Sequence, residues 1–258
     1  MTVFDLHMVL TVIGISFVGG ILGLDRTAAG QFMVSQPVVA GPVTGWLLGD
    51  VTTGLVIGAT LELIWLLDLP VGSFVPADAT IVTVSACAIA VLGPGGGTLP
   101  VIGFSLLLTT AMVPITMQAD SLIRKWNSKL VEKALSSTAE KRARAVSRLH
   151  LSGLPVFFLK SFVLCLMIIP AGLAAVLILA RMPGTVHRAL SLFAKLLPLL
   201  GAALVVRKLT IKTFNLFLLI GFITAAVFGL LIHVPAIIVL VLTVLAGWLG
   251  ARYSEQRS

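Results

Sequence analysis

Long apolar runs, separated by short polar breaks, fill most of the chain. The runs are Met8–Leu24, Val34–Gly49, Val51–Leu67, Ala79–Leu92, Leu99–Met117, Leu154–Ala180, Ala189–Val206, Thr213–Ile232 and Val234–Ala251. A membrane-spanning helix needs roughly 20 apolar residues, and the later runs approach that length. The pattern therefore predicts an all-α polytopic membrane protein with about nine hydrophobic segments.

Several early runs are shorter and are interrupted by glycine and proline. The interrupting residues are Pro37, Gly41, Pro42, Gly45, Gly49, Gly54, Gly58, Pro70, Gly72 and Pro76. Backbone groups freed by such breaks cannot face lipid, and in transporters they line a cavity. We expect Gly/Pro-broken or re-entrant helices in the N-terminal half, with ordinary kinked spanning helices as the alternative.

The composition supports a membrane location. The chain of 258 residues is 58% hydrophobic and only 11% charged, and its mean hydropathy is +1.11. A soluble domain carries about 25% charged residues, so this much apolar surface must face lipid. Cys87 and Cys165 stand alone in apolar runs, which indicates packing residues rather than a metal site or a disulfide. We expect no cofactor and no bound metal.

Basic residues gather in the second half of the chain. Seventeen of the eighteen Lys and Arg residues follow Ile123, whereas seven of the ten acids precede it. Basic residues beside apolar spans stay in the cytoplasm, so this excess indicates topology rather than nucleic-acid binding. Alternation of the segments then places the C-terminus in the cytoplasm and the N-terminus outside. The first run lacks a basic leader, so we expect a retained span and not a signal peptide.

The most basic stretch lies in the middle of the chain and predicts a cytoplasmic helical hairpin. Leu122, Trp126 and Leu130 recur at helical spacing, and residues 137–140 form a capping box that opens a second, short helix. The hairpin could lie on anionic lipid or dock a partner, and a solvated basic loop is the alternative. The predicted division is 1–120, an N-terminal membrane region; 121–152, the hairpin; and 153–258, a C-terminal four-helix membrane region.

Four acids and no base occupy the stretch from Gly41 to Ala79. They are Asp50, Glu62, Asp68 and Asp78. Glu62 lies inside an apolar run, where an ionisable group costs about 2.5–3.5 kcal/mol unless it has a partner or a polar cavity. We interpret Glu62 as a ligand or pathway residue. A structural hydrogen bond to broken backbone, or a bond to a partner subunit, is the alternative.

Carboxylates suit a sugar because they accept charge-assisted hydrogen bonds from hydroxyl groups. If the solute is a sugar, we predict that Glu62 and Asp78 contact its hydroxyl groups, with Asp50 or Asp68 at the mouth of the cavity. Trp65, three residues after Glu62, would share its helix face and offer an aromatic platform, although an interfacial anchor is the alternative. Two basic residues, Lys160 and Lys195, interrupt later apolar runs, and they either extend to the interface or line a subunit contact.

The same stretch resembles the IIC subunits of the mannose/fructose/sorbose family of the phosphoenolpyruvate-dependent sugar phosphotransferase system. The matching residues are Leu48-Gly49-Asp50, Thr53-Gly54, Ile57-Gly58-Ala59-Thr60-Leu61-Glu62, Gly72 and Pro76-Ala77-Asp78-Ala79, with Leu24-Asp25 and Gln36-Pro37 upstream. Three features depart from the family pattern: Ala77 separates proline from aspartate, Thr52 stands where many members have a basic residue, and the link from Asp25 to Pro37 is longer.

The resemblance implies a permease subunit of the bacterial cytoplasmic (inner) membrane. It implies a membrane partner, IID, and oligomers of IIC–IID pairs that bind sugar and move it inward. It also implies that a cytoplasmic IIB protein, phosphorylated on histidine by IIA, phosphorylates the sugar. No phosphorylated or catalytic residue is expected in this chain. The residues alone leave two alternatives open, a self-sufficient ion-coupled secondary transporter and a non-transporting membrane scaffold of the same fold.

Overall fold

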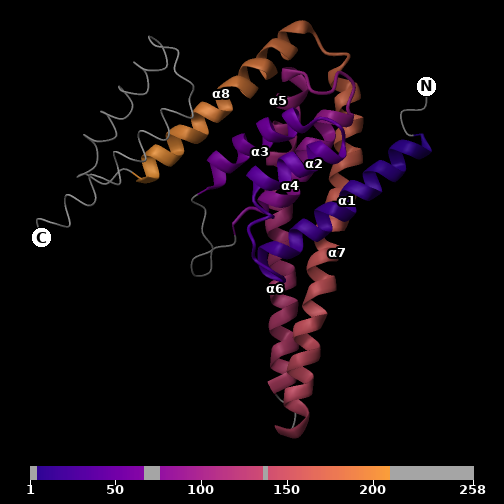
Figure 1. The fold of residues 1–258 in the computed structure, drawn as a ribbon, viewed down its shortest axis with the longest axis vertical. Helices are drawn as coiled ribbons and strands as arrows, with labels where there is room; N and C mark the ends of the chain where they lie inside the picture. Colours follow the sequence, from indigo (N-terminus) through magenta and orange to yellow (C-terminus); the bar gives the residue numbers. More distant parts are fainter. Residues whose placement is uncertain (1–4, 67–75, 136–138, 210–258) are drawn as a thin grey trace, which may run out of the picture. The chain divides into compact units, whose positions relative to one another are not determined.

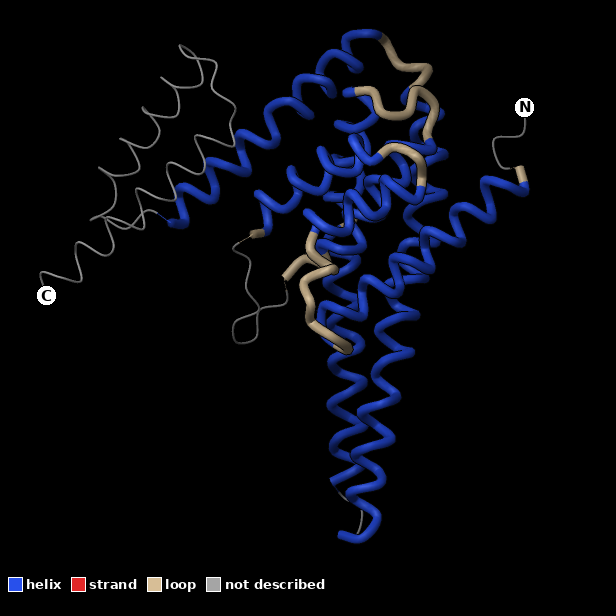
Figure 2. Tube along the Cα trace, viewed as in Figure 1, coloured by secondary structure: helices blue, strands red, loops and turns tan. Residues whose placement is uncertain are grey.

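The computed structural model describes residues 5–66, 76–135 and 139–209, and every regular element in these ranges is an α-helix. The helices are α1 Leu6–Thr27, α2 Pro37–Leu47, α3 Val51–Trp65, α4 Ala79–Leu92, α5 Leu99–Ala111, α6 Val113–Leu135, α7 Ala139–Leu179 and α8 Gly184–Leu209 (Figures 1 and 2). The all-α prediction is therefore confirmed for the described residues.

Four helical stretches are long and apolar enough to cross a membrane. They are Leu6–Arg26, Leu99–Lys129, Gly153–Leu179 and Gly184–Arg207. The prediction of about nine segments is not confirmed, because several early runs form shorter helices. The last two predicted segments, 213–232 and 234–251, lie outside the described residues.

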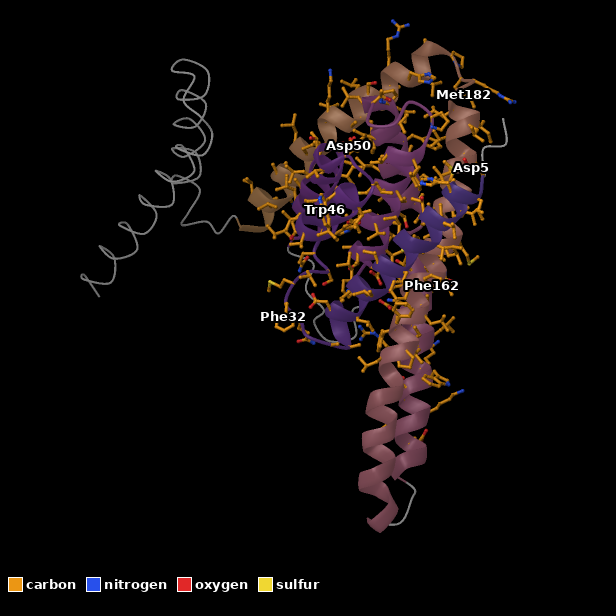
Figure 3. All side chains as sticks on the ribbon, turned by 45° about the vertical axis from the view of Figure 1, so that its right-hand side comes forward. Asp5, Phe32, Trp46, Asp50, Phe162 and Met182 are labelled. Carbon is orange, nitrogen blue, oxygen red and sulfur yellow. The ribbon has the colours of Figure 1, made fainter. Side chains whose placement is uncertain are left out.

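Helices α2 and α3 form a hairpin that is too short to cross a bilayer. They have 11 and 15 residues, which correspond to lengths of about 16 and 22 Å against a hydrocarbon core of about 30 Å. Asp50 lies at the turn of this hairpin and Phe32 lies near its open end (Figure 3). These lengths agree with the broken helices expected from glycine and proline.

The two helices of this hairpin are in backbone contact through four glycines. Gly41 and Gly45 on α2 face Gly54 and Gly58 on α3. A Cβ atom added at Gly45 or at Gly54 would lie 2.9 Å from the Cα atom of the other residue. Small residues four apart allow helices in membranes to approach this closely. The early glycines therefore build a helix–helix interface as well as breaking the runs.

Helix α4 is the buried centre of the described residues. All residues from Thr80 to Ala90 are buried, and α4 packs against α1, α2, α3, α5 and α7. One of its faces joins the apolar core that includes Val12, Ile169 and Leu173. Because α4 touches so many neighbours, the position of its first residue affects several elements at once.

Helices α6 and α7 run side by side away from the other helices, as the lower part of Figure 1 shows. The predicted hairpin is thus present, but its second helix is not short, because α7 continues without interruption for 41 residues to Leu179. Residues 139–152 extend the axis of the span Gly153–Leu179 by about 21 Å. The hairpin therefore continues the axis of that span and is longer than a second, short helix would make it. The three-part division of the chain stays a prediction.

Candidate functional site

Asp50 caps the N-terminus of α3. Its carboxylate accepts the backbone N–H of Thr53 at 3.0 Å and the Thr53 hydroxyl at 2.6 Å. The first N–H groups of a helix have no partner within the helix, and a carboxylate at the N-cap satisfies them. The side chain is half-buried. Asp50 thus has a structural role at the hairpin turn, far along α3 from Glu62.

Glu62 lies near the other end of α3 and caps α2 from outside that helix. Its Oε2 atom accepts the backbone N–H of Val38 at 3.2 Å. Gln36, at the N-cap of α2, makes no side-chain capping bond, and proline occupies the next position. This contact is the structural bond to broken backbone that the sequence left open. The Glu62 side chain is half-buried, and its other carboxylate oxygen has no hydrogen bond among the described residues.

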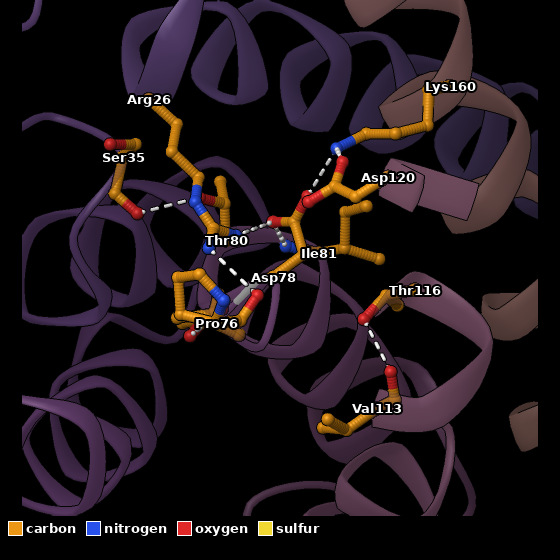
Figure 4. A network of polar contacts seen from close by, with 12 residues as sticks. Arg26, Ser35, Pro76, Asp78, Thr80, Ile81, Val113, Thr116, Asp120 and Lys160 are labelled. Carbon is orange, nitrogen blue, oxygen red and sulfur yellow. Dashed lines mark hydrogen bonds and ion pairs between the residues drawn. The ribbon is translucent and has the colours of Figure 1, made fainter. Parts of the chain in front are cut away.

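Asp78 caps α4 and is the centre of a buried charge cluster, which consists of Arg26, Asp78, Asp120 and Lys160 (Figure 4). Its carboxylate is 3.2 Å from Arg26 Nη1 and 2.6 Å from Lys160 Nζ, and it also accepts the N–H of Ile81 at 3.3 Å. The side chain is 1% exposed. The Asp78 carboxylate is therefore paired with groups of this chain on both of its oxygens.

Lys160 joins two acids from different helices. Its ammonium group lies 2.6 Å from Asp78 and 2.6 Å from Asp120 on α6, and its side chain is only 6% exposed. The sequence offered two interpretations of Lys160, extension to the interface or a subunit contact. Neither describes this buried position. Asp78 also pairs with Arg26, which lies outside the acidic stretch from Gly41 to Ala79.

Further side-chain hydrogen bonds attach the loop between α1 and α2 to the same region. Asp25 accepts the backbone N–H groups of Phe32 at 2.6 Å and Ser35 at 3.1 Å. The Thr80 hydroxyl on α4 donates to the carbonyl oxygen of Ser35 at 2.8 Å. Arg26 also donates to the carbonyl of Pro76 at 3.2 Å. The loops that precede α2 and α4 are thus connected to each other through side chains.

The structure brings some of the predicted sugar contacts together and separates others. Glu62 and the start of α4, which Asp78 caps, both reach the segment from Ser35 to Val38. Asp50 lies at the opposite end of the α2–α3 hairpin (Figure 3), and Asp68 lies outside the described residues. Trp65 is half-buried against a core that includes Ile57 and Leu61. No group of three potential metal ligands occurs among the described residues.

Arg26, Asp120 and Lys160 were not predicted as parts of this site. A signal was present for each, since a charged residue in or beside an apolar run normally has a partner. The partners could not be assigned, because Lys160 is 82 residues from Asp78 and 40 from Asp120. Only the folded chain shows which acid meets which base.

Comparison with known proteins decides the family. Residues 8–245 match the family described as "PTS system sorbose-specific iic component". The chain is an IIC subunit of the mannose/fructose/sorbose phosphotransferase family. The resemblance found in the stretch from Gly41 to Ala79 is therefore confirmed, and the match extends through both halves of the IIC subunit.

Individual relatives agree with this assignment. The IIC subunit is 27% identical over 196 residues to the sorbose-specific EIIC component of Klebsiella pneumoniae. The matched region covers 74% of this chain and 71% of the relative. It is 24% identical over 233 residues to the mannose-specific EIIC component of Escherichia coli K12, which covers 87% of this chain and 84% of the relative. The IIC subunit is thus a multi-pass membrane component of a sugar phosphotransferase system.

Two solved structures share its fold. One, described as a membrane protein, has a TM-score of 0.71 at 21% identity and covers 97% of this chain and 99% of its own. The other is the mannose transporter ManYZ in complex with microcin E492, with a TM-score of 0.54 at 20% identity and coverage of 97% and 98%. At these identities the likeness shows the fold alone.

Proposed function

We propose that this IIC subunit works with a IID subunit in the bacterial cytoplasmic membrane. The pair binds a sugar and moves it inward, while a IIB protein, recharged by IIA, phosphorylates the sugar. The observation that carries the proposal is the family match over residues 8–245, because it includes both the broken helices and the acidic stretch. Two relatives in this family are named as sorbose-specific and mannose-specific components.

Within that function, Glu62 is the best candidate for a direct sugar contact. It is half-buried on α3, and one of its carboxylate oxygens is available for a ligand hydroxyl. Trp65 lies one turn further along the same helix and stays a candidate platform. Asp50 is a weaker candidate, because Thr53 occupies its carboxylate. Asp78 is proposed to support the site rather than to contact the sugar, because Arg26 and Lys160 surround it.

Glu62→Gln should lower sugar affinity on the order of ten- to hundredfold. The amide keeps the shape but removes a charged acceptor, and hydrogen bonds to charged groups contribute roughly 1.5–3 kcal/mol, where 1.4 kcal/mol is tenfold. The measurement is calorimetric binding of mannose and sorbose to the purified IIC–IID complex, with sugar phosphorylation by added phospho-IIB as a second assay.

Asp5→Asn is the matched control for Glu62→Gln, because Asp5 also accepts a helix N–H, from Met8 at 2.8 Å, but lies exposed at the start of α1. It should bind sugar as the wild type does. Unchanged sugar binding by Glu62→Gln would show that Glu62 only caps α2, and the proposed contact would then be wrong.

We also propose that the α6–α7 hairpin and the C-terminus face the cytoplasm. The start of α1, marked by Asp5, lies at the other end of the described helices from the hairpin (Figure 3), so the N-terminus would face outside. In a background lacking Cys87 and Cys165, single cysteines at Ser137 and Ser254 should resist an impermeant thiol reagent in intact cells. Met182→Cys, in the exposed turn before α8, should react. The reverse labelling pattern would invert the orientation.

A further inference from the structure

A lysine inside an apolar span needs a specific explanation. Lys160 lies within the span Gly153–Leu179, and a buried ion pair is often no more stabilising than apolar residues of the same volume. Stability alone therefore does not account for a lysine at this position. What Lys160 does is fix the relative positions of α6, α7 and the start of α4, because its ammonium group bonds Asp120 and Asp78 at 2.6 Å each.

The contacts of Asp78 continue from Lys160 toward Glu62. Asp78 caps α4 through the N–H of Ile81, and Thr80, in the first turn of α4, holds the carbonyl of Ser35 at 2.8 Å (Figure 4). Ser35 lies two residues before α2, whose first turn donates the Val38 N–H to Glu62. The contacts in this series are hydrogen bonds and an ion pair, and two short backbone segments, from Asp78 to Thr80 and from Ser35 to Val38, connect them.

We infer that Lys160 is a positioning residue for the sugar site, acting through Asp78 and Thr80 on the end of α2 that Glu62 caps. The inference rests on the proposed function, since it assumes that Glu62 contacts the sugar. Binding sites tolerate little displacement, and a shift of about 1 Å far from the chemistry can cost on the order of a hundredfold in enzymes. Loss of the Lys160–Asp78 bond should therefore weaken sugar binding without removing any sugar contact.

The four charges of the cluster sum to zero. Variants that keep this balance can therefore distinguish a role of Lys160 in positioning the sugar site from a role in the stability of the subunit. Lys160→Met alone leaves an excess buried carboxylate and should impair assembly. Lys160→Met with Asp120→Asn removes one charge of each sign and leaves the Arg26–Asp78 pair. If the cluster served stability only, this double variant would recover both assembly and sugar affinity. We expect it to recover assembly but to bind sugar about tenfold more weakly.

Two further variants keep the test informative if the double variant fails to assemble. Thr80→Val changes no charge and little shape, but it removes the bond to Ser35, so sugar affinity should fall by a similar factor. Asp120→Asn keeps Lys160 on Asp78 but leaves one excess buried cation, so assembly should fall, whereas the sugar affinity of the complex that does assemble should stay within about twofold of the wild type. Lys195→Met is the matched control, because Lys195 is also a lysine in an apolar span but its side chain is exposed.

The measurements are calorimetric binding of mannose and sorbose to the purified IIC–IID complex and the rate of sugar phosphorylation by phospho-IIB. For the assembled variants, we expect the sugar concentration at half-maximal rate to rise while the rate at saturating sugar stays close to that of the wild type. Wild-type affinity in both the double variant and Thr80→Val would overturn the positioning role and leave the proposed function standing. A wild-type complex that neither binds nor phosphorylates sugar would instead overturn the proposed function.

Discussion

Gly54→Leu is expected to abolish the folded subunit. A Cβ atom at Gly54 would lie 2.9 Å from the Cα atom of Gly45 and 3.0 Å from the carbonyl carbon of Gly41. Both neighbours are backbone atoms of α2, so no side-chain rotation can relieve the contact. Overpacking costs about 1–3 kcal/mol where side chains can yield, and more is expected here because the whole hairpin must open.

The measurement is the fraction of subunit that elutes as a monodisperse complex after detergent extraction, together with its thermal melting midpoint. Gly54→Ala should lower the midpoint, and Gly54→Leu should leave no monodisperse species. Gly14→Leu is the matched control, because a Cβ atom at Gly14 on α1 would meet nothing within 4 Å. Equal behaviour of the Gly54 and Gly14 variants would show that the close contact between α2 and α3 is dispensable.

The chain expressed alone is expected to take up no sugar. The proposed function requires IID to complete the pathway and phospho-IIB to trap the sugar as a phosphate ester. In cells that lack other sugar permeases, co-expression with IID, IIB and the phosphate-donating proteins should restore uptake of radiolabelled sugar. All of the accumulated sugar should be phosphorylated, so the expected effect is the presence or absence of transport.

Omission of IIB alone is the control that separates binding from group transfer, because the IIC–IID pair would then still bind sugar but accumulate none. Accumulation of unmodified sugar by the chain alone, abolished by an ionophore, would support an ion-coupled transporter instead. Absence of uptake in the complete system, despite normal assembly and sugar supply, would support the scaffold alternative.

Local features of the fold were predictable from the sequence. The predicted bounds of α4, Ala79 to Leu92, are those observed, because an aspartate precedes the helix and a glycine follows it. The length of α7 was not predictable from composition. The change from basic to apolar residues near 152 indicates a change of environment, but helix propensity continues across it, and α7 does not end there.

The acidic residues show where the interpretation of the site was incomplete. Asp50 and Asp78 directly precede apolar helices, which is the N-cap position, and in the structure both cap, although both were assigned from the sequence only to the sugar site. Broken helices inside a membrane expose N–H groups that water cannot satisfy, so such helices require acceptors at their starts. The cation partners of Asp78 required the fold, because no local pattern relates Asp78 to Lys160.

The buried charge cluster also affects how the chain can be inserted during synthesis. Lys160 follows Asp78 by 82 residues, which takes about 4–16 s at a synthesis rate of roughly 5–20 residues per second. Throughout that interval Arg26 is the only member of the cluster that can neutralise Asp78, and Asp120 emerges before its lysine. The ion pairs of Lys160 with Asp78 and Asp120 can therefore form only after α7 emerges, so the cluster is completed late in the synthesis of the membrane region that it holds together.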